Sequence, residues 1–193
     1  MAVQWNDNAL RYGAVSRALH WGMALLFLWQ FTGMATKYVL GRTPVTAFFV
    51  GTHVSVGSLL FLLILIRAVW GLSQLRHRPP HEPGPLGKLA WLGHLVLYLL
   101  MLIVPVLAVL RALGSGRGYS VFGVQIAAAT GETIPWMVAP ASLLHKPLAW
   151  ILLVLIAGHI AFAITHRVVW KDDILARMAG PGRPQTGSPP ARG

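Results

Sequence analysis

Two histidines, His145 and His159, lie fourteen residues apart in a segment composed almost entirely of Leu, Ile, Val and Ala. At about 100° per residue, fourteen residues turn through about 1400°, so both imidazoles face the same side of one helix, about 21 Å apart. His53 and Arg67 repeat this spacing in an earlier apolar segment. Because neutral imidazole is an axial ligand for haem iron, the spacing indicates two haems held at two depths.

Apolar segments long enough to position these residues occur four times. The stretches without Asp, Glu, Lys or Arg are 19 to 24 residues long and cover 18–36, 43–66, 89–110 and 147–166. About 20 apolar residues cross the hydrocarbon core of a bilayer, and inside lipid they must be helical. We therefore predict an all-α integral membrane protein, a four-helix bundle enclosing two b haems.

The predicted domain covers residues 1–178, with spans at about 15–38, 46–70, 88–111 and 143–168. Residues 179–193 are rich in Pro, Gly, Ser and Arg, which predicts a disordered cytoplasmic tail. The long connection 111–146 contains a Gly-rich turn at Gly114, Gly116 and Gly118 and an apolar patch, 121–129, for which we expect a short helix on the membrane surface.

Basic residues give the chain a net charge of +11, but they flank the apolar segments and form no stripe interleaved with aromatic residues, which argues against nucleic-acid binding. Eleven of the sixteen basic residues would lie on the same side of the membrane as both termini. The positive-inside bias predicts that this side is the cytoplasm. The five on the other side are Lys37, Arg42, Arg111, Arg117 and Lys146. With no cysteine in the chain, covalent haem attachment, disulfides and iron–sulfur clusters are excluded.

The depths of the histidines in antiparallel spans suggest how they pair. His53 and His145 are the two outer ones and pair with each other. His159, at the inner level, has two candidate partners, His20 and His94. Counting residues slightly favours His94, but uncertainty in the span boundaries leaves the choice open.

Arg67 lies on the same face as His53, at the inner depth. An arginine inside a membrane is costly, so a propionate of the inner haem is one expected partner. The alternative is that its side chain reaches the nearby membrane surface.

Four motifs carry a family resemblance. They are RALHW at 17–21, THVSVG at 52–57, LGHLVLY at 92–98, and GH at 158–159 followed by His166 and WKD at 170–172. Together they resemble the bacterial cytochrome b561 family over residues 10–178.

The resemblance implies a four-helix bundle in the bacterial inner membrane with two non-covalent b haems, each held by two histidines. It assigns the outer haem to His53 and His145 and the inner haem to His20 and His159. His94 then becomes a neighbouring or propionate-contacting residue.

Among family members, the chain most resembles those that oxidise superoxide and reduce ubiquinone. Five basic residues against one acid, Glu132, on the outer side fit an anionic substrate. These residues would form a basic funnel that attracts superoxide, and its candidates are Lys37, Arg42, Arg117 and Lys146. The alternative is an ordinary basic loop. His166 and Trp170 are candidates for a quinone contact, with an interfacial anchor as the alternative.

Two other functions stay open. One is a cytochrome b subunit that anchors a quinone-linked dehydrogenase or hydrogenase and relays its electrons. The other is a haem-free structural or transport protein, which would be colourless. A homodimer and a separate redox partner protein are both compatible with the sequence.

Overall fold

The protein, described by a computed structural model over residues 3–80, 84–172 and 174–179, is built from long helices. The order is α1 (Ala14–Leu40), α2 (Pro44–Ser73), α3 (Pro85–Gly114), β1 (Tyr119–Val121), β2 (Val124–Ala127), α4 (Pro135–Thr165), the π-helix η1 (His166–Trp170) and α5 (Ile174–Ala179). Prolines begin α2, α3 and α4, where a missing N–H costs nothing. The predicted tail 179–193 lies almost entirely outside the described residues.

The expected surface helix at 121–129 is wrong. This segment forms an antiparallel hairpin of β1 and β2 around the turn Phe122–Gly123, with positive φ at both turn residues. Such a turn suits two tightly joined strands, and the flanking alternation of β-branched and polar residues favours strands over a helix.

Among the residues that the structure describes, three helical segments are long and apolar enough to cross a membrane: Pro44–Ser73, Pro85–Gly114 and Pro135–Trp170. Helix α1 is also long, but polar residues such as His20 and Gln30 lower its mean hydropathy. Large apolar side chains on these helices remain exposed, for example Leu62, Val69 and Val154. The structure is thus that of a helical membrane protein.

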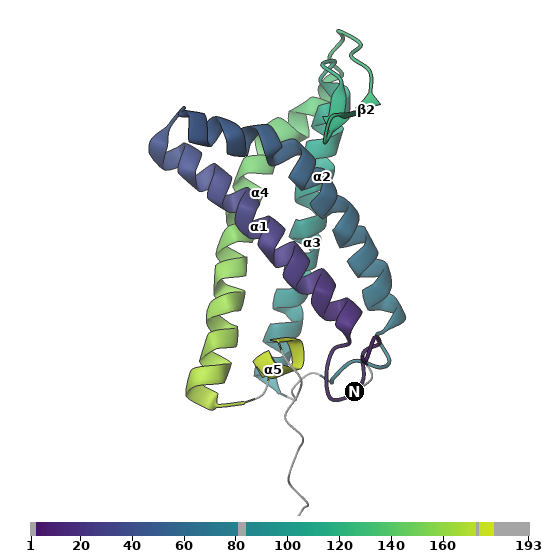
Figure 1. The fold of residues 1–193 in the computed structure, drawn as a ribbon, viewed down its shortest axis with the longest axis vertical. Helices are drawn as coiled ribbons and strands as arrows, with labels where there is room; N and C mark the ends of the chain where they lie inside the picture. Colours follow the sequence, from purple (N-terminus) through teal and green to yellow (C-terminus); the bar gives the residue numbers. More distant parts are fainter. Residues whose placement is uncertain (1–2, 81–83, 173, 180–193) are drawn as a thin grey trace, which may run out of the picture.

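The two ends of the molecule differ (Figure 1). The hairpin lies at one end, here called the hairpin end, while the N-terminal segment and α5 lie at the other, here called the terminal end. At the terminal end the Tyr12 amide donates to the Arg177 carbonyl at 3.2 Å, and the Trp21 indole donates to the Met178 carbonyl at 3.1 Å. Helix α1 packs mainly against α2, and α3 mainly against α4.

An apolar layer separates the two ends. Leu60 of α2 is seven residues from both His53 and Arg67, and it is 3% exposed. Leu152 is likewise seven residues from both His145 and His159, and it is 1% exposed. Each leucine belongs to a cluster of buried apolar side chains, and Phe27 of α1 and Met101 of α3 pack against both clusters. The histidines therefore divide into two groups, one at each end of this layer.

Candidate functional site

His53 of α2 and His145 of α4 face each other at the hairpin end. Their ring centres are 6.3 Å apart and their planes are at 81°. Both residues are half-buried. Helical spacing places each ring on the same face as the buried leucine of its own helix, two turns away.

The second nitrogens of these two rings have different surroundings. His145 Nδ1 lies 3.1 Å from the carbonyl oxygen of Val104. Because a carbonyl can only accept, Nδ1 carries the proton and Nε2 keeps its lone pair. His53 Nδ1 is buried with no hydrogen-bond partner among the described residues. Such an atom in a membrane helix indicates a group that the polypeptide does not itself supply.

At the terminal end three histidines meet. The ring of His159 lies 6.4 Å from that of His20, with planes at 65°, and 5.3 Å from that of His94. His20 and His159 are half-buried, whereas His94 is exposed. His94 Nδ1 also donates to the Ala90 carbonyl of its own helix at 2.7 Å.

The distances separate these histidines by what they can hold. A metal–imidazole bond is about 2.0 Å long and the ring centre lies about 1.1 Å beyond the nitrogen, so two imidazoles on opposite sides of one iron have centres about 6.2 Å apart. The His53–His145 and His20–His159 separations match this value, and the His94–His159 separation is too short. No cluster of three or more His, Asp or Glu side chains that could hold a metal occurs in the described part of the chain. Each matching pair can therefore supply one nitrogen to each side of an iron atom.

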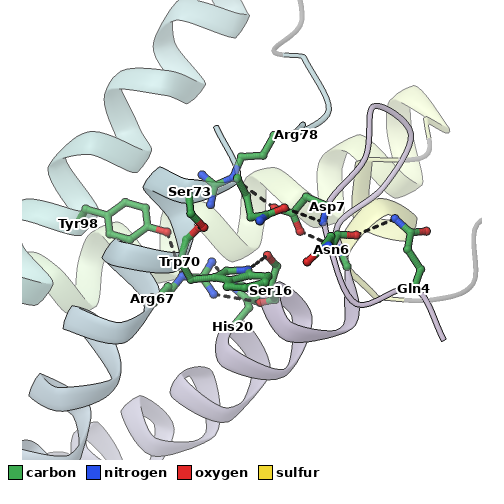
Figure 2. A network of polar contacts seen from close by, with 12 residues as sticks. Gln4, Asn6, Asp7, Ser16, His20, Arg67, Trp70, Ser73, Arg78 and Tyr98 are labelled. Atoms are coloured by element: carbon green, nitrogen blue, oxygen red, sulfur yellow. Dashed lines mark hydrogen bonds and ion pairs between the residues drawn. The ribbon is translucent and has the colours of Figure 1, made fainter. Parts of the chain in front are cut away.

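Arg67 lies beside His20 and Ser16 at the terminal end (Figure 2). Its Nε donates to the Tyr98 hydroxyl at 3.0 Å, and a terminal nitrogen donates to the Ser16 carbonyl at 3.3 Å. The other terminal nitrogen is 3.4 Å from His20 Nδ1, a weak contact at the limit of a hydrogen bond. None of the ion pairs found among the described residues involves Arg67. Its charge therefore has only uncharged partners there.

The N-terminal segment closes this end. The side chain of Asp7, fully buried, pairs with Arg78 at 3.4 Å and accepts from the Gly13 amide at 2.8 Å (Figure 2). Trp70 donates to the Ser16 hydroxyl at 2.9 Å. These bonds fix the start of α1, and with it His20, against α2.

His166 and Trp170 come together in η1. Their ring centres are 4.3 Å apart, and Phe162 adds a third ring 4.6 Å from His166. His166 is buried, and its Nδ1 is hydrogen-bonded to the carboxylate of Asp172. The carboxylate was missed from sequence, although it ends the WKD motif. The Val104 carbonyl was also missed, and no side-chain pattern could have indicated a backbone acceptor.

The four predicted outer cations lie on separate segments of the hairpin end and are exposed: Lys37, Arg42, Arg117 and Lys146. Arg117 lies between Gly116 and Gly118, both with positive φ. A Cβ on Gly116 would lie 2.5 Å from the Glu132 carbonyl oxygen, so only glycine allows this close crossing of two loop segments.

Comparison with known proteins adds the family. The family model described as prokaryotic cytochrome b561 matches residues 11–181. The chain belongs to the prokaryotic cytochrome b561 family. It is therefore a haem b-binding membrane protein of electron transport.

Individual relatives agree with this membership. Cytochrome b561 homolog 2 of Escherichia coli is 32% identical over 186 residues, covering 92% of this chain and 96% of that protein. A probable superoxide oxidase, CybB, of Yersinia pestis is 26% identical over 172 residues, covering 87% of this chain and 95% of that protein. Cytochrome b561 homolog 1 of E. coli is 26% identical over 191 residues, with coverages of 87% and 96%.

Proposed function

We propose that this b561-family cytochrome holds two b haems and transfers single electrons from superoxide at the hairpin end to ubiquinone at the terminal end. His53 and His145 would ligate one haem, and His20 and His159 the other. The observation that carries the proposal is the pair of ring separations, 6.3 and 6.4 Å, at the two ends of one bundle. When bound, each haem supplies a reversible one-electron couple.

A fourth membrane crossing, by α1, is part of the proposal. The Tyr12–Arg177 and Trp21–Met178 hydrogen bonds bring the chain's start and the end of its described helices to one end. This requires an even number of crossings, and three apolar spans alone would give an odd number. The positive-inside bias makes the terminal end cytoplasmic, as expected in a bacterial inner membrane.

At the hairpin end the role of the protein's own residues is to attract an anion. Exposed cations there raise the local concentration of superoxide and its association rate. The reaction balances as two superoxide ions giving two O₂ and two electrons, which with two protons convert ubiquinone into ubiquinol. The similarity to a probable superoxide oxidase supports this substrate choice.

At the terminal end, the group formed by Phe162, His166 and Trp170 has the features of a quinone contact. Two aromatic faces offer stacking for a flat ring, and the imidazole offers hydrogen bonding to a carbonyl. Asp172 holds Nδ1 of His166, which leaves Nε2 for the quinone.

A haem count followed by superoxide addition tests the proposal. The purified protein should contain two b haems per chain by pyridine haemochrome assay. Xanthine oxidase with xanthine supplies superoxide, and the haem bands should become reduced, then reoxidise when a soluble ubiquinone is added. Superoxide dismutase, included as a control, should abolish the reduction. Absence of haem refutes the whole proposal. Two haems that superoxide does not reduce refute the substrate and favour the electron-relay subunit of a dehydrogenase or hydrogenase.

A further inference from the structure

We propose that Arg67 makes the terminal-end haem the electron acceptor of the two, so that electrons move from the hairpin end to the terminal end. The inference rests on the proposed function, because it needs both haems. Arg67 would thereby set the order of the two midpoint potentials.

Arg67 carries a positive charge at the terminal end. The hydrogen-bond partners of its guanidinium among the described residues are the Tyr98 hydroxyl and the Ser16 carbonyl, and His20 Nδ1 lies 3.4 Å away. All three are neutral, so they orient the charge without cancelling it. Reducing a haem lowers the charge of its site by one, and a nearby cation in a medium of low dielectric constant favours that change.

A propionate beside Arg67 would not reverse this result. With such a partner the pair is neutral, and without Arg67 the propionate would leave a negative charge at the site. In both cases the arginine makes the site more positive by one unit than the same site lacking it. Arg67 therefore raises the midpoint potential of the terminal-end haem.

The hairpin end has the opposite bias. His145 Nδ1 donates to the Val104 carbonyl, and such a bond makes the imidazole a more basic ligand. A more basic ligand stabilises the oxidised iron and lowers the potential. Lys146, next to His145 in the sequence, and Lys37 and Arg42, which precede His53, are exposed, so solvent and salt screen their charges. Two independent contacts thus point to the same order of potentials.

This order of midpoint potentials favours electron transfer towards the terminal end. An electron that moves inwards across a membrane with a negative interior moves against the membrane potential. A higher potential at the terminal end offsets that opposition. Arg67 places the needed charge beside the haem ligand nearest the acceptor.

Redox titration of variants tests the inference. His145→Ala should leave only the terminal-end haem, so its midpoint potential can be measured without overlap. In that background Arg67→Gln should lower the midpoint potential of this haem. The ratio of oxidised to reduced haem at a fixed potential should rise at least tenfold, which is about 59 mV for one electron. R67K keeps the charge and should keep the potential. K88Q removes an exposed cation from the same end and should change nothing.

The outcomes are separable. If R67Q retains its haem and the midpoint is unchanged or raised, the inference is wrong while the proposed function stands. If R67Q loses the haem, Ser16→Asp gives a second reading, since it adds a carboxylate beside an intact Arg67 and should lower the same midpoint. An unchanged midpoint in S16D that retains haem then overturns the inference. A wild-type protein without haem overturns both proposals.

Discussion

Replacing His20 with alanine should halve the haem content of the protein, whereas replacing His94 should leave it unchanged. Both residues lie beside His159, so the two variants ask which of them completes the terminal-end pair. Residue counting along the chain favours His94, and the three-dimensional distances favour His20.

The magnitude follows from the geometry. The expected separation of ring centres across one iron is about 6.2 Å. The His20–His159 separation differs from it by about 0.2 Å, and the His94–His159 separation, at 5.3 Å, falls short by about 0.9 Å. His94 would also have to leave its exposed position. H20A should therefore lower the ratio of haem to chain from two to one.

The assay is the pyridine haemochrome ratio to protein, measured on both variants after purification in detergent with haem supplied during expression. H53A is the positive control, because it should also lose one haem, from the other end. A difference spectrum should show that H20A and H53A lose different components of the α band. Retention of both haems by H20A together with loss of one by H94A would refute the distance argument.

Three further predictions follow from other parts of the structure. Lys146→Glu should slow haem reduction by superoxide several-fold in stopped-flow traces and weaken its dependence on salt, because one cation of the hairpin end becomes an anion; an unchanged rate would remove Lys146 from the funnel. His166→Ala should slow reoxidation by quinone at an unchanged haem content, while H77A, in an exposed turn of the same end, should not. Gly116→Ala should destabilise the protein by about 1–3 kcal/mol, because φ is positive there and the added Cβ would meet the backbone of Glu132. G131A, at a similar φ but with open space around the Cβ, should lower the melting temperature less in thermal melts, and equal costs would contradict the crowding argument.

The sequence predicted several features of the fold from local chemistry. Runs of uncharged residues longer than a bilayer crossing predicted the long helices, since such runs satisfy their backbone only as helices. Residues 18–36 likewise form part of the long helix α1, although a histidine, a glutamine and two tryptophans make it less apolar than the other three. The prediction failed for residues 121–129, where apolar composition does not distinguish a surface helix from a hairpin and the positive-φ turn decides.

By itself the sequence determined which side chains share a helix face: fourteen-residue spacing puts His145 above His159 and His53 above Arg67 whatever the rest of the chain does. Only the tertiary structure decided which face meets which, bringing the ring of His20 to 6.4 Å from that of His159 and the Val104 carbonyl to His145. The physical reason is that helical phase is a local property of the backbone, whereas the distance between rings on different helices depends on how the apolar layer around Leu60 and Leu152 packs.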